Sequence, residues 1–160
     1  MSRARLEGWR SIQERGEDSA IESDERVSVS RAVVPLTEAG ARILGERYWL
    51  TVRRASFGLV RLGRTRDGSV LRLAGAPLLR FAQADLASGP NGVCCSFPIR
   101  GGLLAQRPGG MLVLSQANGC ELRAALTGFV PRLGTRPYDR IQRRVHVAIS
   151  RRFFRSLIDE

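Results

Sequence analysis

The sequence of 160 residues contains no lysine and a single histidine, His146. The absence of lysine excludes a lysine Schiff base, a pyridoxal-phosphate anchor and the lysine of a phosphate-binding P-loop. One histidine is too few for the multi-histidine metal sites of zinc enzymes. The chain also lacks the G-x-G-x-x-G motif of dinucleotide-binding proteins. We therefore expect no cofactor and no metal site.

Cysteine is also scarce, with Cys94, Cys95 and Cys120 as the only three residues of this type. An odd number, two of them adjacent, does not suit a disulfide framework and favours a reducing cytoplasm. Neighbouring strand residues point to opposite faces, so Cys94 and Cys95 cannot face one ion. We expect Cys95 to lie in the core beside Phe97.

Long apolar runs are missing as well. No segment approaches the length of a membrane span, so we expect no transmembrane segment. Arg3 and Arg5 are not followed by the apolar run of a secretory signal. These absences predict a cytoplasmic protein.

Charge is abundant and uneven, with 26 arginines against 15 acidic residues and a net charge of +11. Residues 1–25 are polar, charged and without periodicity, which predicts a disordered tail. Residues 26–160 are long enough for one core and are expected to form a single domain.

Apolar periodicity orders that domain. Alternation over 26–33 predicts a strand, and 37–54 predicts a helix that Gly40 and Gly45 weaken. Short alternating segments follow between Ser56 and Val130, separated by turn signals such as Asn118-Gly119. Strands grouped together in this way favour an α+β fold with an antiparallel sheet of about six or seven strands.

The segment PYDRIQRRVHVAISRRFFRSLI, residues 137–158, predicts a long C-terminal amphipathic helix. At 100° per residue one stripe of this helix is apolar, and we expect it to pack on the sheet. The stripe contains Ile141, Val145, Ile149, Phe153 and Leu157. A closed β-barrel with the helix outside is the alternative architecture.

The order of the strand 26–33, the helix 37–54, the strands and the helix 137–158 resembles the helix-grip or START-like superfamily (SRPBCC proteins, including polyketide cyclases). The chain departs from that pattern in having one helical segment after the first strand, where the superfamily usually has two shorter ones, and in its first 25 residues. The resemblance implies an apolar ligand, lipid-like or polyketide-like, held between sheet and helix. It carries no catalytic residue over, because no motif aligns.

The residues that would contact such a ligand lie on the inward face of the expected sheet and on the helix stripe. They are Cys95, Phe97, Ile99, Leu122, Leu126, Val145 and Ile149. The competing interpretation is that these side chains pack together and leave no cavity.

The other side of the C-terminal helix is basic. It contains Arg140, Arg143, Arg144, Arg151 and Arg155. A solvated face is one interpretation, and docking of the acidic tail is another. The functional alternative is a basic interaction module that binds nucleic acid or an anionic membrane surface. No RNA-recognition motif or zinc-finger pattern accompanies the charge.

Catalytic groups are not evident. His146 could act as a general base and Ser150 lies one turn further, but Asp139 is two turns away from His146. Three groups on one helix surface also lack an oxyanion hole. We assign no catalytic residue, and the sequence leaves open whether the protein is an enzyme.

Overall fold

Nine strands and two helices follow one another in the part of the chain that the structure, a computed structural model, describes: residues 4–15, 20–118, 120–132 and 135–159. They are β1 (Leu6–Arg15), β2 (Ile21–Val29), α1 (Glu38–Ala55), β3 (Val60–Thr65), β4 (Gly68–Leu73), β5 (Ala76–Ala82), β6 (Asp85–Gly89), β7 (Gly92–Gly101), β8 (Met111–Ala117), β9 (Glu121–Phe129) and α2 (Thr135–Ile158). The predicted α+β class is confirmed.

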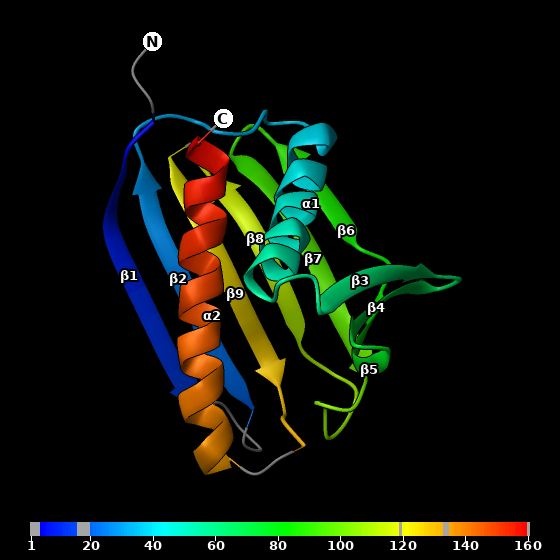
Figure 1. Ribbon diagram of the computed structural model, residues 1–160. Coiled ribbons are helices and arrows are strands. Elements are labelled where there is room, and N and C mark those ends of the chain that lie inside the picture. Colours follow the sequence, from blue (N-terminus) through cyan, green and yellow to red (C-terminus); the bar gives the residue numbers. More distant parts are fainter. Residues whose placement is uncertain (1–3, 16–19, 119, 133–134, 160) are drawn as a thin grey trace.

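The strands form an antiparallel sheet in the order β1-β2-β9-β8-β7-β5-β4-β3. β7 pairs with β6 along its first half and with β5 at its end, where Phe81 lies opposite Ile99. β3, β4 and β5, here called the wing, project from the sheet beside the C-terminal end of α1 (Figure 1). The sheet is open, because β1 and β3 lie at its two ends, so the closed barrel is wrong.

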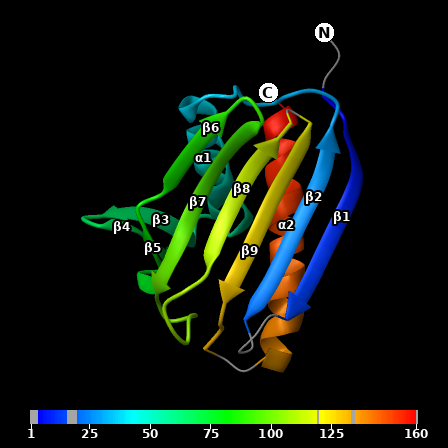
Figure 2. The same ribbon diagram turned by 180° about the vertical axis from the view of Figure 1, so that it is seen from behind.

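Both helices lie on the same face of the sheet (Figure 1). The view from behind shows the opposite face, which neither helix covers (Figure 2). This asymmetry follows from the alternation of the strands, whose apolar side chains point to one face. An antiparallel sheet with a C-terminal helix laid across it is compatible with the helix-grip resemblance.

α1 matches the helix predicted over 37–54, and its two glycines do not interrupt it. Both glycines lie where a side chain would collide with a neighbour. A Cβ on Gly40 would lie 1.8 Å from the carbonyl oxygen of Pro35, and a Cβ on Gly45 would lie 2.9 Å from Cys95 Sγ. The helix propensity lost at these positions is therefore exchanged for close contact with the sheet and the preceding loop.

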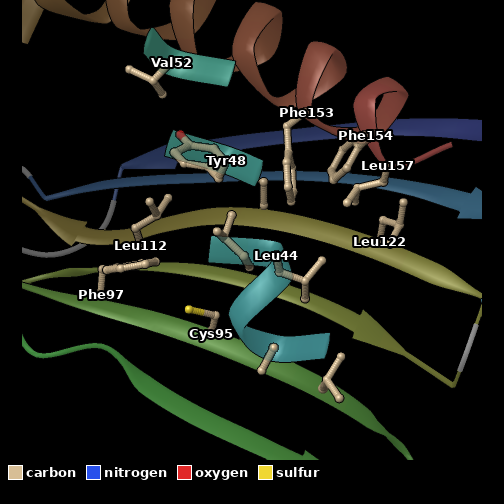
Figure 3. Close-up of a cluster of buried hydrophobic side chains, with 14 of the residues drawn as sticks. Leu44, Tyr48, Val52, Cys95, Phe97, Leu112, Leu122, Phe153, Phe154 and Leu157 are labelled. Carbon is tan, nitrogen blue, oxygen red and sulfur yellow. The ribbon is translucent and has the colours of Figure 1, made fainter. Parts of the chain in front are cut away.

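The core lies between the helices and the sheet (Figure 3). Leu44 and Tyr48 of α1 and Phe153 of α2 meet there, and the Tyr48 and Phe153 rings pack edge to face with centroids 5.4 Å apart. Cys95 is buried in the core near Phe97, as predicted, and it also packs against Gly45. Burial raises the pKa of the Cys95 thiol to about 12, so this thiol is structural rather than reactive.

The prediction of a disordered tail over residues 1–25 is wrong for the described residues of that segment. β1 occupies Leu6–Arg15, and β2 begins at Ile21, before the strand predicted from residue 26. The β1–β2 register shifts between Glu7 and Arg10. This bulge breaks the two-residue alternation, so the strand shows no periodic signal in the sequence. Trp9, inside the bulge, packs on Phe154 of α2 with ring centroids 5.9 Å apart.

The described residues form two strands more than the upper prediction of seven. One is β1, and the other is β6, whose sequence DLASG contains a single large apolar residue. β6 pairs along one edge with β7, from Asp85 opposite Ser96 to Gly89 opposite Gly92. Strand pairing rather than side-chain pattern therefore stabilises this element, which explains why the alternation rule missed it.

α2 includes the predicted helix, but its apolar stripe packs on the sheet only in its C-terminal half. Phe153 and Leu157 are buried, and Ile149 is half-buried. Ile141 and Val145 are 67% and 48% exposed, so the prediction that they pack on the sheet is wrong. The face that is buried instead contains His146, Ser150, Phe153, Phe154 and Leu157.

Candidate functional site

A cavity of about 490 Å³ lies between α1, α2, the wing and the central strands. α1 and the turn after it contribute Tyr48, Trp49, Val52, Ala55 and Ser56, and α2 contributes Val145, His146, Ala148, Ile149 and Arg152. The wing contributes Val60, Leu71, Leu78, Leu79 and Phe81, and Ile99, Leu104, Leu112 and Leu126 complete the wall. Nearly all of these side chains are apolar, so the cavity is shaped for an apolar molecule.

The cavity explains the partial packing of α2. Val145, Ala148 and Ile149 line the cavity, together with residues of the wing and of the C-terminal end of α1. This part of the stripe therefore faces open space instead of the sheet. An apolar residue that lines a cavity keeps solvent-accessible surface, whereas the same residue in a packed core does not. The position of Val145 in the cavity wall therefore accounts for its exposed surface.

Four of the seven residues expected to contact a ligand line this cavity. They are Ile99, Leu126, Val145 and Ile149. Cys95, Phe97 and Leu122 do not line it, because they are buried in the core beneath α1 and α2. Phe97 acts one layer below the wall, where it packs edge to face on Trp49 with ring centroids 5.4 Å apart.

Two polar atoms in the cavity wall have no hydrogen-bond partner among the described residues. They are His146 Nε2 and Trp49 Nε1, and both atoms are buried. A buried polar atom without a partner costs about 1–3 kcal/mol. Both residues line the cavity, together with the polar residues Tyr48, Ser56 and Arg152, but the two atoms themselves have almost no accessible surface, so a ligand reaches them only if their side chains shift.

His146 is neutral in this setting. Burial lowers its pKa from 6.5 to about 4, although a hydrogen bond with the backbone of Ala124 and the charge of Asp24 oppose the shift. The bond with Ala124 raises the pKa, so the ring N–H donates it to the backbone carbonyl, and Nε2, which has no partner among the residues described, is the acceptor of the neutral imidazole. Nε2 therefore suits a donor such as a hydroxyl group rather than a carbonyl or a carboxylate.

The lowered pKa of His146 predicts a loss of stability in acid. The unfolded chain takes up a proton near pH 6.5, whereas the folded protein does so only near pH 4. The stabilising contribution is complete above pH 6.5 and is lost as pH falls from 6.5 through 4, by about 3 kcal/mol in total. Urea unfolding of the wild type and of His146→Gln across this range isolates the effect. Parallel curves for the two proteins would contradict it.

A second buried polar group lies between β2 and α2, outside the residues that the sequence singled out. Glu25 accepts a hydrogen bond from the Ser11 hydroxyl and is almost fully buried. Burial raises the pKa of Glu25, although hydrogen bonds with Ser11 and Gln13 and the charge of Arg151 oppose the shift. Ser150, the residue before Arg151 on α2, is also buried, and its hydroxyl has no partner in the described part of the chain.

The hydrolytic arrangement considered for His146 is not assembled in the described residues. Neither His146 Nε2 nor Ser150 Oγ has a hydrogen-bond partner there, so the structure shows no hydrogen bond between base and nucleophile. The side chain of Asp139 lies outside the described residues.

The basic face of α2 is partly engaged within the protein. The guanidinium carbons of Arg151 and Arg155 lie 5.6 and 5.9 Å from the centre of the Trp9 ring, within reach of cation–π attraction. Arg144 is exposed, and the side chains of Arg140 and Arg143 lie outside the described residues. Two of the five arginines therefore help to hold β1 against the helix, and anion binding by this face stays a prediction.

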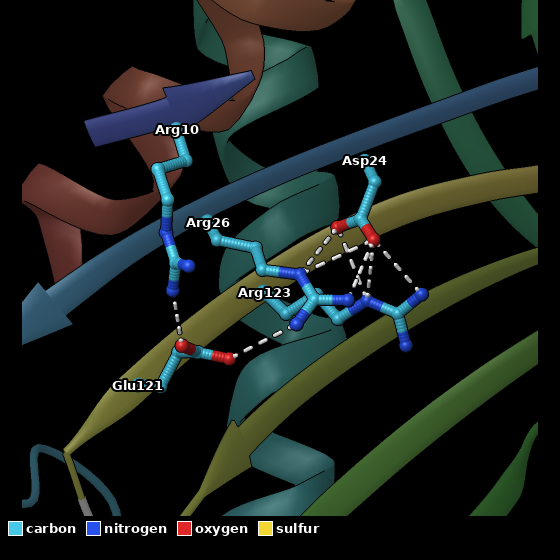
Figure 4. Close-up of polar contacts among 5 residues, drawn as sticks. All are labelled: Arg10, Asp24, Arg26, Glu121 and Arg123. Carbon is cyan, nitrogen blue, oxygen red and sulfur yellow. Dashed lines mark hydrogen bonds and ion pairs between the residues drawn. The ribbon is translucent and has the colours of Figure 1, made fainter. Parts of the chain in front are cut away.

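Arginines on the uncovered face of the sheet are also paired (Figure 4). Asp24 contacts Arg26 at 2.9 Å and Arg123 at 3.1 Å, and Glu121 contacts Arg10 at 2.8 Å. Burial alone would raise the pKa of Asp24, but the hydrogen bonds and charges of these two arginines lower it below its usual value. This network joins β1, β2 and β9 and neutralises part of the basic charge.

The structure also adds cavity residues that sequence reasoning missed. Trp49 and Phe81 line the cavity, and His146 is one of its few polar lining residues. A signal was available in α1, where Ala41, Leu44, Tyr48 and Val52 recur at helical spacing and are all buried. Trp49 stands one residue away from that stripe, so its side chain reaches the edge of the packed face.

The described residues contain no group of three or more histidine, cysteine, aspartate or glutamate side chains that could hold a metal ion. Neither helix in the described part of the chain is long and apolar enough to cross a lipid bilayer. No protein-family model matches this chain, and no curated protein or solved structure matches it either.

Proposed function

We propose that this protein binds a small apolar molecule, lipid-like or polyketide-like, in the cavity between α1, α2 and the wing. The observation that carries the proposal is the cavity itself, about 490 Å³ in volume with an almost wholly apolar wall. Cavities that hold small molecules are usually about 300–1,000 Å³ in volume and mostly apolar, with a few polar groups.

Two further features support the proposal. Val145 and Ala148 remain exposed on α2 because they line the cavity, and such apolar exposure is unfavourable unless something covers it. The helix laid across an antiparallel sheet also agrees with the START-like resemblance, whose members hold ligands in this position. We also propose a cytoplasmic location, which the three free thiols support.

The polar positions narrow the ligand class. His146 Nε2 belongs to a neutral imidazole, and Trp49 Nε1 can only donate a hydrogen bond. A hydroxyl group can both donate and accept, so it suits either position. The proposed ligand is therefore an apolar molecule that carries a hydroxyl group, and Arg152 in the cavity wall can donate to a further oxygen.

Fluorescence binding tests the proposal. Trp9→Phe leaves Trp49, in the cavity wall, as the only tryptophan. The neutral probe N-phenyl-1-naphthylamine is chosen because it is not attracted by arginines. We expect its fluorescence to rise and Trp49 emission to fall on binding. Leu126→Phe with Ala148→Phe fills the cavity from two sides and should weaken binding about tenfold or more.

The control is Ala87→Phe, which makes the same change at an exposed alanine of β6 outside the cavity wall. It should bind like the wild type. Equal binding by the filled variant and the control, or no binding at all across a panel of apolar probes, contradicts the proposal.

A matched pair of ligands, 2-naphthol and 2-methylnaphthalene, tests the polar positions. The hydroxyl group should improve affinity about two- to tenfold, the value of one hydrogen bond.

A further inference from the structure

The turn that follows α1 forms an exposed tip. The chain leaves the helix at Ala55 and enters β3 at Val60. The amide of Phe57 donates to the carbonyl of Arg54 at 3.1 Å, and the amide of Ala74 donates to the carbonyl of Leu59 at 3.1 Å. The second bond joins this turn to the β4–β5 turn, so two turns form one surface.

The apolar side chains of this surface are not packed. Phe57 is 95% exposed and has a φ of 55°, in the left-handed region that aromatic residues rarely adopt. Leu59 and Leu73 are exposed beside it. A strained backbone at an aromatic residue that gains no packing inside the protein points to a role for that side chain outside it.

Arginines surround the apolar side chains. Residues 47–80 contain eight arginines and one acidic residue, Asp67. Arg61 and Arg72 lie directly opposite each other on β3 and β4, and with Leu59 they line a hollow of about 360 Å³. Arg61 Nε donates to the carbonyl of Gly58 at 2.9 Å, which fixes it at the turn. Among the described residues neither arginine forms an ion pair, and like charges facing each other repel.

We propose that this surface, the docking tip made of Phe57, Leu59, Leu73, Arg61 and Arg72, binds the surface of an anionic lipid bilayer. Phe57 and the leucines enter the boundary between headgroups and acyl chains, and the arginines contact the lipid phosphates. Charge complementarity supports this partner, because the charged residues of 47–80 are almost all arginines and the cytoplasmic leaflets of membranes are anionic.

The shape of the tip favours a bilayer over a protein partner. Aromatic residues that dominate protein interfaces enter pockets surrounded by further contacts. Here the aromatic side chain is almost wholly exposed at a turn, and Arg61 is hydrogen-bonded to the carbonyl of Gly58 in the same turn, so apolar and cationic groups lie close together, as a bilayer surface requires.

The docking tip borders the cavity. Ala55, Ser56, Val60 and Leu71, which line the cavity, are neighbours in sequence of Phe57, Arg61 and Arg72. A bilayer bound at the tip therefore lies next to the cavity wall. Membrane binding does not depend on the proposed ligand, and the two are tested separately.

Vesicle co-sedimentation tests the docking tip. We expect the wild type to bind phosphatidylcholine vesicles containing about 30% phosphatidylserine in about 0.1 M salt, and to be released in about 0.5 M salt. Phosphatidylcholine alone should bind little. Arg61→Gln with Arg72→Gln should weaken binding roughly 25-fold, or about fivefold per arginine. Phe57→Asn should weaken it about tenfold, and it stays folded because asparagine tolerates a left-handed backbone.

Two controls match these variants. Arg5→Gln with Arg31→Gln removes the same charge at exposed positions outside the basic face of α2, and Ile12→Thr removes an exposed apolar side chain at the opposite edge of the sheet. Both should bind like the wild type. The proposal is overturned if the wild type ignores anionic vesicles, or if the charge control loses as much binding as the tip variant. It is also overturned if Phe57→Asn abolishes self-association in light scattering while vesicle binding is unchanged.

Discussion

Replacing Phe153 with alanine is expected to lower the free energy of unfolding by about 3–5 kcal/mol. Phe153 is 1% exposed, and its ring packs on Tyr48 of α1 and on Phe154, with centroids 5.4 and 5.5 Å apart. The substitution removes the side chain that joins the two helices above the sheet. Urea unfolding followed by circular dichroism measures the loss.

Ile141→Ala is the matched control on the same helix. Ile141 belongs to the apolar stripe that the sequence predicts, yet it is exposed, so its removal should change stability by less than about 0.5 kcal/mol. Similar losses for Phe153→Ala and Ile141→Ala would show that the helix packs along its whole stripe, contrary to the structure.

This contrast shows how far periodicity can predict a fold. The pattern predicted α1 to within one residue at either end, because its apolar residues repeat at helical spacing strongly enough to outweigh the weakening by Gly40 and Gly45. It also placed Phe153 and Leu157 in the core. It could not separate these from Ile141 and Val145, because periodicity identifies an apolar stripe but not where the neighbouring layer ends.

Strand β1 was missed for a different reason. The bulge between Glu7 and Arg10 shifts the alternation midway, and many of the remaining side chains are polar or charged. Its position depends on partners far along the chain: β2, the ion pair between Arg10 and Glu121, and the contact of Trp9 with α2. Contacts of this kind have no local signature.

The second large effect is expected at Gln116, which lies in β8 and is fully buried. Its Oε1 accepts hydrogen bonds from the amides of Val33 at 2.8 Å and Val34 at 3.2 Å, and its Nε2 donates to the carbonyl of Val34 at 2.9 Å. Gln116→Leu leaves these three backbone groups without partners. We expect the free energy of unfolding to fall by about 3–5 kcal/mol. Each unpaired group costs about 1–3 kcal/mol, and the cost is smaller where water reaches the group.

Gln106→Leu makes the same chemical change at an exposed position and should cost less than about 0.5 kcal/mol. Limited proteolysis gives a second measurement, because the segment between β2 and α1 should be cut faster once the Gln116 bonds are gone. If Gln116→Leu unfolds at the same urea concentration as the control, then the three hydrogen bonds do not stabilise the connection to α1.

Only some of the residues that line the cavity could be predicted from the sequence. Ile99 and Leu126 were predicted to face the helix because they alternate along their strands, and both line the cavity. The wing residues Leu79 and Phe81 were not predicted to line it. Their place in the wall depends on β7, which pairs first with β6 and then with β5. A single-strand pattern carries no information about which partner a strand pairs with.

The division of β7 between two partners has a consequence for opening motions. The wing pairs with β7 through β5 alone, at Arg80 opposite Gly101 and Phe81 opposite Ile99, with a register shift between the two pairs. The ladder through β1, β2, β9, β8 and the first half of β7 does not depend on that junction. The amides of Leu103 and Leu104 also donate to the carbonyls of Pro77 and Leu78 in β5, but these few bonds are all local to the wing. We therefore expect the wing to open at a lower free-energy cost than the rest of the sheet. Such a partial opening would expose Leu79 and Phe81 to solvent while Leu114 and Leu122, in the central strands, stay buried.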